Sequence, residues 1–357
     1  MEPIRMYYKD YLQLDKILDA QRPASFEPGQ QPAHDEMLFI VIHQAFELWF
    51  KQILFELDYV MGIFGKERIN DNAEDMHLAL HRLHRVHEIL GLLNQQVTIL
   101  DTMMPMDFLE FRNLLTPSSG FQSLQFRLIE AKLGLEMGKR HQADYYKRTN
   151  EGGFSQSDFD AINRTESTPT LIQRINNWLE RMPFFDASLW SINEEAPAPI
   201  DHPFWKAYRD IYRSGLTERE VRKIDDFDYV FFDQGPAEGI QGSDLRGALS
   251  AGAMRAALFT ILYRHYPVFQ NSFEILDTLV EIDNQLAAWR HAHYRMVRRM
   301  IGMRVGTGNT SGQGYLEGAV SKHFIFRDLA GLSTYLIERK KLPRLPEGLV
   351  ERLGFVG

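Results

Sequence analysis

The chain has 357 residues, 44% of them hydrophobic, which is enough apolar material for one large domain or two ordinary ones. A formal net charge of −8 argues against a sequence-independent nucleic-acid binder, because such proteins normally carry a basic surface. The absence of cysteine excludes disulfides, cysteine nucleophiles, thiolate metal sites and haem held through a cysteine, while the 12 histidines leave imidazole ligation open.

The N-terminal residues contain no apolar core of signal-peptide length. The longest purely apolar run of the chain, Met37 to Ile42, is too short to cross a bilayer. We therefore expect a soluble, cytoplasmic protein that binds neither a membrane nor nucleic acid.

Apolar residues recur at helical spacing through most of the chain, and no series of alternating strands with hairpin turns is evident. This pattern predicts long helices from Asp35 to about Met61, from Asp75 to about Leu100 and from Ser272 to Met303. Gly302 and Gly306 are expected to end the last of them.

Shorter signals lie between the long helices. Ser119 followed by Gln122 is a capping-box pattern that predicts the start of a further helix. The stretch from about Gly138 to Thr170 is polar and loses periodicity, so we interpret it as a loop or insertion. After a second weak region, an alanine-rich helix is predicted from about Asp244 to Tyr266.

The sequence thus predicts an all-α fold, a large helical bundle formed by one domain over residues 1–357. Residues 138–242 are expected to form a loop-rich helical insertion within it.

His43 lies in the most apolar stretch of the chain. Phe39 precedes it by four residues, and Phe46 and Phe50 follow on roughly the same helix face, which predicts an aromatic-lined pocket with one titratable group. A core histidine hydrogen-bonded to backbone is the alternative, and this segment alone favours the alternative.

His293 shares an apolar helix stripe with Trp289 and Val297. His291 is two residues away and, at about 100° per residue, points to nearly the opposite side. Only one of the two can face a buried cofactor, and His293 has the apolar surroundings that a haem plane requires. For this helix alone, a packed core histidine remains the better interpretation.

Arg112 follows Phe108 by four residues, so its guanidinium is expected to leave an otherwise aromatic helix face, where it suits the capture of a substrate carboxylate. A salt bridge to a neighbouring helix is the alternative. The glycine-rich run from Gly306 to Gly312 has the wrong spacing and context for a dinucleotide-binding loop. It fits a glycine-hinged flap over a polar ligand, or an ordinary surface turn.

A row of four histidines at helical spacing invites a zinc interpretation, which we reject because no cysteine and no clear carboxylate completes a site. The row comprises His77, His81, His84 and His87.

Five long segments, in order along the chain, resemble the tryptophan 2,3-dioxygenases. They are His34 to Asp58, Phe111 to Glu130, Trp289 to Gly302, Gly306 to Gly312 and Leu329 to Ile337. The resemblance implies a b-type haem buried between long helices. It also implies cleavage of the indole C2–C3 bond of L-tryptophan by O₂ to give N-formylkynurenine, in the kynurenine pathway of tryptophan catabolism.

Carried over to this sequence, the resemblance implies that His293 is the proximal ligand of the haem iron. His43 would be the distal histidine that faces the indole N–H, and it is the catalytic residue of this assignment. Phe39 and Phe108 would be walls of the substrate pocket.

The same resemblance implies that Arg112 binds the amino-acid carboxylate and that Thr307, with a haem propionate, holds the ammonium group. Tyr8 and Tyr11 match positions that in the family reach into a neighbouring subunit's site. Residues 1–33 are therefore expected to contact a neighbouring subunit in a homotetramer.

Three positions depart from the family pattern. Asn309 and Thr310 replace a glycine and a serine of the glycine-rich run, and Ala292 stands where a larger polar residue is common. One alternative is therefore a related haem oxygenase of secondary metabolism that acts on a β-methylated or ring-substituted tryptophan and inserts one oxygen atom. Another is a non-catalytic sensor of haem or tryptophan.

Overall fold

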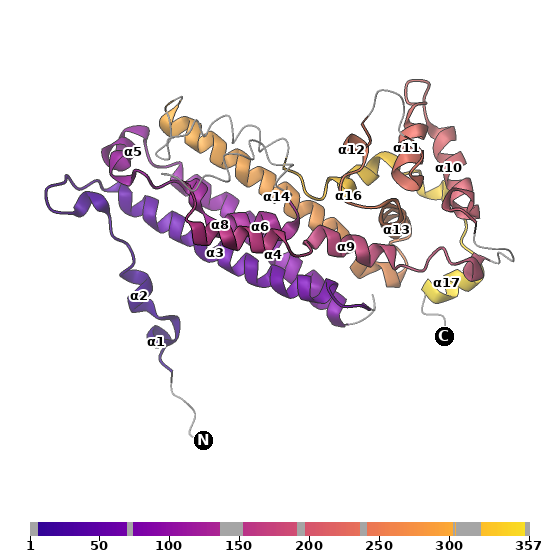
Figure 1. Cartoon of the computed structure of the whole chain (residues 1–357), viewed down its shortest axis with the longest axis horizontal. Helices are drawn as coiled ribbons and strands as arrows, with labels where there is room; N and C mark the ends of the chain where they lie inside the picture. The colour runs from indigo at the N-terminus through magenta and orange to yellow at the C-terminus, as the bar shows by residue number, and fades with distance from the viewer. Residues whose placement is uncertain are drawn as a thin grey trace, which may run out of the picture.

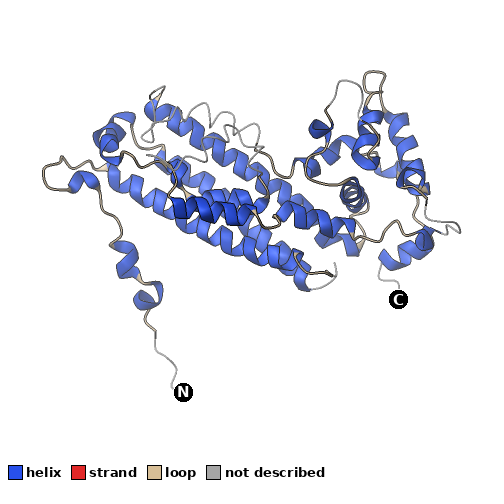
Figure 2. Cartoon of the chain, viewed as in Figure 1, coloured by secondary structure: helices blue, strands red, loops and turns tan. Residues whose placement is uncertain are grey.

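The computed structural model describes residues 6–69, 74–135, 153–190, 197–235, 241–302, 304 and 323–353. Every regular element within these ranges is a helix (Figure 2). The predicted all-α class is therefore confirmed.

Three long helices form an elongated bundle (Figure 1). They are α3 (Asp35–Phe64), α4 (Glu74–Leu100) and α14 (Gln270–Ile301), and α4 packs against both of the others. All three were expected from apolar periodicity. As predicted, α14 ends at Gly302, whose positive φ of 56° favours glycine, whereas Gly306 lies outside the described residues.

Shorter helices cover this bundle: α5 (Pro105–Phe111), α6 (Leu124–Leu133), α8 (Gln156–Glu166) and α9 (Leu171–Glu180). The loop predicted for residues 138–170 is wrong where α8 stands, while residues 136–152 lie outside the described ranges. Ile162 is the one buried residue of α8, which explains why apolar periodicity did not reveal this helix.

A second group of helices lies at the other end of the molecule (Figure 1, right). It contains α10 (Pro203–Gly215), α11 (Lys223–Phe232), α12 (Gly242–Leu245), α13 (Ala251–Leu262), α16 (Arg327–Gly331) and α17 (Glu347–Leu353).

The single alanine-rich helix expected from Asp244 to Tyr266 is divided into α12 and α13. Between them, the backbone N–H groups of Gly247 and Leu249 donate to the buried carboxylate of Asp328. Ser250 then caps α13 by accepting from Ala253 N. Asp328, which is distant in sequence, thus accepts hydrogen bonds from backbone N–H groups that would donate within the helix if α12 and α13 were continuous.

The N-terminal helices α1 (Tyr8–Leu12) and α2 (Leu14–Leu18) extend away from the bundle and bury no residue against it (Figure 1). The chain joins the bundle at Ala24 and Ser25, whose backbone N–H groups both donate to the buried Glu36 carboxylate at 2.8 Å. Just before this point, Gln44 of α3 accepts from Gln21 Nε2 at 2.6 Å and donates to the carbonyl oxygen of Ala20 at 3.1 Å. The N-terminal arm, residues 6–19, therefore departs from the bundle before Ala20.

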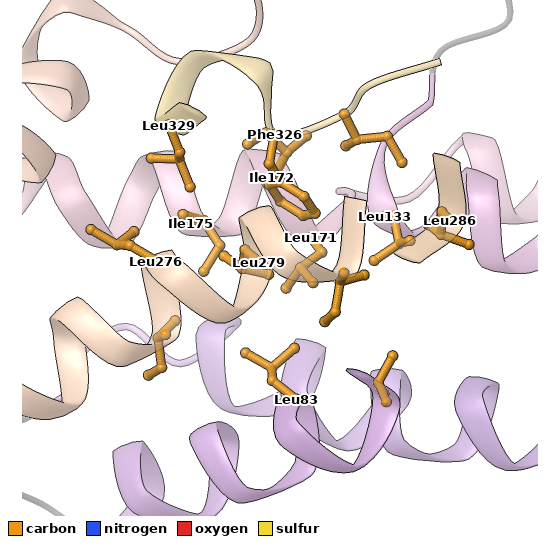
Figure 3. Close-up of a cluster of buried hydrophobic side chains, with 14 of the residues drawn as sticks. Leu83, Leu133, Leu171, Ile172, Ile175, Leu276, Leu279, Leu286, Phe326 and Leu329 are labelled. Carbon is orange, nitrogen blue, oxygen red and sulfur yellow. The ribbon is translucent and has the colours of Figure 1, made fainter. Parts of the chain in front are cut away.

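One hydrophobic cluster runs through both groups of helices. Figure 3 shows its centre, where Leu83 of α4, Leu133 of α6, Ile172 of α9, Leu279 of α14 and Leu329 of α16 converge. The bundle and the second group are therefore packed on a common core.

By length and composition alone, α3 is apolar enough to cross a membrane, although its purely apolar run is short. However, its Glu56 is 1% exposed and pairs with Arg85 of α4 at 2.7 Å and with Arg82 at 3.5 Å. These ion pairs and its packing show that one face of α3 is joined to α4 in the bundle.

Candidate functional site

A cavity of about 350 Å³ lies between α3, α5, α6 and α14. Most of its wall is aromatic, and a short polar stretch before α6 completes it. The lining residues are Phe39, His43, Phe46, Glu47, Phe50, Phe108, Leu115, Ser118, Ser119, Gly120, Gln122, Ser123, Phe126, Trp289 and His293.

The cavity brings together residues singled out from the sequence: Phe39 and His43 from α3, Phe108 from α5, and His293 from α14, with Phe46, Phe50 and Trp289 beside them. His291 is exposed, as the helical phase of α14 requires when His293 faces inward. The structure thus brings together two histidines that are 250 positions apart in the chain.

His43 is held in one tautomer by its own helix. Its Nδ1 lies 2.7 Å from the carbonyl oxygen of Phe39, and only a protonated Nδ1 can donate to that acceptor. Nε2 is then left with a lone pair. Burial lowers the pKa of His43, so the ring is neutral at neutral pH. The Phe39 ring lies against the imidazole, with centroids 4.1 Å apart.

His293 is also neutral. Burial lowers its pKa to about 4, and the positive charges of Arg127 and of a protonated His43 would oppose its protonation further. A neutral imidazole is the form that can donate a nitrogen lone pair to a metal. The indole of Trp289 lies parallel to the His293 ring, with an interplanar angle of 6° and a centroid distance of 5.3 Å.

Arg112 directly follows α5. Its backbone N–H donates to the carbonyl oxygen of Phe108, as in a continuing helix, and it opens the 3₁₀ turn η2 (Arg112–Leu115). Arg112 is half-buried and lies in the chain between Phe108 and Leu115, which both line the cavity, but it is not itself a lining residue.

Two other predicted residues lie elsewhere, and the position of a third is not described. Tyr8 and Tyr11 are 75% and 70% exposed on α1 and do not reach the cavity of their own chain. Thr307 lies outside the described residues, as do Asn309 and Thr310.

The polar edge of the cavity, residues 118–123, was not recognised from sequence as part of a site. The capping box of Ser119 and Gln122 exists, but it encloses the 3₁₀ turn η3 (Gly120–Gln122), and α6 begins only after Ser123, whose side chain caps it. A run of small polar residues between two apolar helical segments was the available signal.

A buried charge network lies beside the cavity. The Glu130 carboxylate of α6 accepts from Arg127 at 2.9 Å and from Arg290 of α14 at 3.0 Å, and all three residues are at most 6% exposed. Arg290 also donates to the carbonyl oxygen of His323 at 3.0 Å. The network therefore links α6, α14 and the chain that leads into α16, one helical turn before His293.

Comparison with known proteins matches residues 2–336 to the family model described as tryptophan 2,3-dioxygenase. A protein named tryptophan 2,3-dioxygenase from Bdellovibrio bacteriovorus is 39% identical, with 98% of each chain covered. Proteins of the same name from Dictyostelium discoideum and Aedes aegypti are 39% and 41% identical, covering 98% and 95% of this chain and 88% and 87% of theirs. The match includes the cavity-forming helices α3, α5, α6 and α14. This chain therefore belongs to the tryptophan 2,3-dioxygenase family.

Proposed function

We propose that this protein is a haem-dependent dioxygenase that cleaves the indole C2–C3 bond of L-tryptophan with O₂ to give N-formylkynurenine. The observation that carries the proposal is the meeting of two neutral histidines, from α3 and α14, in one aromatic-lined cavity. The relatives named above favour tryptophan itself over a modified tryptophan as the substrate.

The residues of the cavity fit a b-type haem. The described residues contain no group of three or more histidine and acidic side chains able to hold a metal ion, so a bare ion would lack ligands here. A porphyrin brings four ligands of its own and needs one neutral imidazole, which His293 offers, and a large apolar surface, which the phenylalanines offer. When bound, the haem would supply O₂ activation.

The protein's contribution is to bind and orient the substrate. In the tautomer fixed by the Phe39 carbonyl, His43 presents Nε2 as an acceptor, which suits the indole N–H of tryptophan. Phe39 and Phe108, whose ring centroids are 5.8 Å apart, would enclose the indole and exclude water.

The amino-acid end of the substrate is assigned to Arg112 and Thr307. Arg112 would pair with the carboxylate, which its place between Phe108 and Leu115 supports, and Thr307 with a haem propionate would hold the ammonium group. When both the carboxylate and the ammonium group of the substrate are held, the substrate can bind in one orientation only.

We further propose a cytoplasmic homotetramer in which Tyr8 and Tyr11 reach the site of a neighbouring subunit. The exposure of both rings, on a helix that buries no residue, supports this assignment.

Mass spectrometry of the product after turnover in isotopically labelled O₂ tests the proposed reaction. The ferrous holoenzyme is given L-tryptophan, and N-formylkynurenine carrying two labelled oxygen atoms is the expected product. A product with one labelled atom, or turnover of a β-methylated but not of an unsubstituted tryptophan, would establish the modified-tryptophan oxygenase instead. Ligand binding without any kynurenine absorbance would indicate a sensor.

A further inference from the structure

Trp289 is the closest aromatic neighbour of His293 on its own helix. The two residues are four positions apart on α14, and their rings are parallel, with an interplanar angle of 6° and centroids 5.3 Å apart. A spacing of four residues puts side chains on one helix face, but it does not by itself make two rings parallel. Something else therefore holds the indole in this orientation.

Three phenylalanines from two other helices hold it. Phe46 and Phe50 of α3 meet the indole edge to face, with interplanar angles of 83° and 80°, and Phe126 of α6 lies 4.7 Å away by centroid distance. Edge-to-face and offset pairs of this kind are favoured arrangements of aromatic rings. The indole plane is thus fixed by side chains of α3 and α6, and not by the helix that carries His293.

A haem-ligating histidine needs its ring orientation fixed, and in most sites a hydrogen bond from the second ring nitrogen does so. Within the described part of the chain, no hydrogen bond to the imidazole ring of His293 is found. The one close ring contact of His293 recorded there is the face of Trp289. The indole of Trp289 therefore does for the His293 ring what a hydrogen-bond acceptor does in most haem-ligand and metal sites.

We infer that Trp289 is the positioning residue for the iron-ligating imidazole of His293, which it orients by stacking and not by a hydrogen bond. This inference rests on the proposed haem site. The phenylalanines that hold Trp289 also connect the two histidines, because Phe46 contacts the His43 ring as well, with centroids 6.0 Å apart. The ligand side and the substrate side of the site would then share one aromatic scaffold.

Two variants of the holoenzyme test the inference. Trp289→Phe keeps a smaller stacking ring, and Trp289→Leu removes the stack. Trp178→Leu is the matched control, because Trp178 is also buried and packs against a phenylalanine, Phe64, but does not line the cavity. The rate of haem transfer to an excess of an apo-globin acceptor and the iron–histidine stretching band of the ferrous protein are measured for each.

We expect haem loss about 10-fold faster in Trp289→Leu, as is typical when a residue that orients a metal ligand is removed. Trp289→Phe should fall between this variant and the wild type, and the iron–histidine band should shift or broaden in the same order. Trp178→Leu should match the wild type in both measurements. If Trp289→Leu does not fold, a band shift in Trp289→Phe that is absent from Trp178→Leu supports the inference.

Unchanged haem loss and an unchanged band in both Trp289 variants would overturn the inference. Equal changes in Trp178→Leu would overturn it too, since they would reveal a general packing effect. A wild-type protein without a Soret band would instead refute the haem site itself, so the two failures are distinguishable.

Discussion

The distal side of the site depends on one nitrogen atom of His43. Its Nδ1–H is engaged by the Phe39 carbonyl, so Nε2 can only accept a hydrogen bond while the ring is neutral. We expect His43→Ala to lower kcat/KM for L-tryptophan about 10-fold, since one hydrogen bond contributes about 1 kcal/mol or slightly more. Steady-state kinetics measure this change.

A substrate analogue provides the control for this prediction. 1-Methyltryptophan has no indole N–H, so the same substitution should cost its turnover or binding much less. Equal losses with tryptophan and with the methylated analogue would show that His43 acts through packing and not through the hydrogen bond.

A further buried histidine, His202, is expected to make the stability of the protein sensitive to acid. His202 caps α10, where its Nδ1 accepts from Phe204 N, and burial lowers its pKa from 6.5 to about 4. The unfolded chain takes up this proton at higher pH than the folded chain does. The contribution of His202 to stability is therefore complete above about pH 6.5 and is lost as the pH falls towards about 4.

His202→Asn should reduce this loss, because asparagine offers a cap acceptor that does not titrate. Urea unfolding near neutral pH and at about pH 4.5 measures the difference between midpoints. We expect a smaller difference in His202→Asn than in the wild type. The exposed His291, replaced in the same way, should leave the difference unchanged, and an identical response of both variants would contradict the assignment.

At the scale of the helices, Glu130 holds α6 to α14. Glu130→Ala leaves the buried guanidinium groups of Arg127 and Arg290 without this carboxylate. Breaking a buried pair from one side typically costs about 3–5 kcal/mol, so the free energy of unfolding should fall by this amount. Urea unfolding followed by circular dichroism measures it.

Glu338→Ala is the control, because Glu338 forms exposed ion pairs with Lys340 and Lys341. Its removal should leave the unfolding midpoint almost unchanged. If both substitutions have equally small effects, the network beside the cavity does not hold the two helices together.

The long helices could be predicted from sequence because each buries a continuous apolar stripe, as α4 does through Leu83 and Leu90. The predicted helix boundaries were wrong where a helix buries too few residues to form a stripe, or where its backbone groups bind a residue distant in the sequence. Helix α8 buries only Ile162. The break between α12 and α13 depends on the carboxylate of Asp328, which is about 80 residues away in the chain.

The site could be predicted in part for the same reason. Helical phase alone placed His293, and not His291, towards the interior, and it grouped Phe39 with His43. It could not show that α5 ends at Phe111 and that a 3₁₀ turn follows, because helix ends are set by local hydrogen bonds and not by apolar periodicity. Nor could it show that Trp289 and His293 stack, which depends on phenylalanines of other helices.

At the scale of the whole molecule, the N-terminal arm can be separated from the bundle, since α1 and α2 bury nothing against it. Deletion of residues 1–19 should leave the helical circular dichroism and the haem content per chain intact. If the arm completes a neighbour's site, activity should fall at least 10-fold, as expected when substrate-positioning groups are lost. Steady-state kinetics and light scattering measure activity and assembly.

A mixing experiment distinguishes a contribution between subunits from one within a subunit. His293→Ala supplies arms without an active haem, and the arm-deleted chain supplies a haem site without an arm. Co-expression of the two inactive chains should restore activity above the sum of the separate proteins. No recovery in verified mixed oligomers would contradict the exchange of arms.

Helix α14 belongs to both ends of the molecule. It begins after Phe269 against α13 in the second group of helices, and its last turns carry Trp289 and His293 into the cavity. A continuous helix is a rigid element that can carry energetic coupling from one of its ends to the other. Destabilising substitutions in the second group of helices would therefore weaken haem binding at the far end of α14. Variants whose substituted residue has no contact with the cavity would then lose activity because they lose haem.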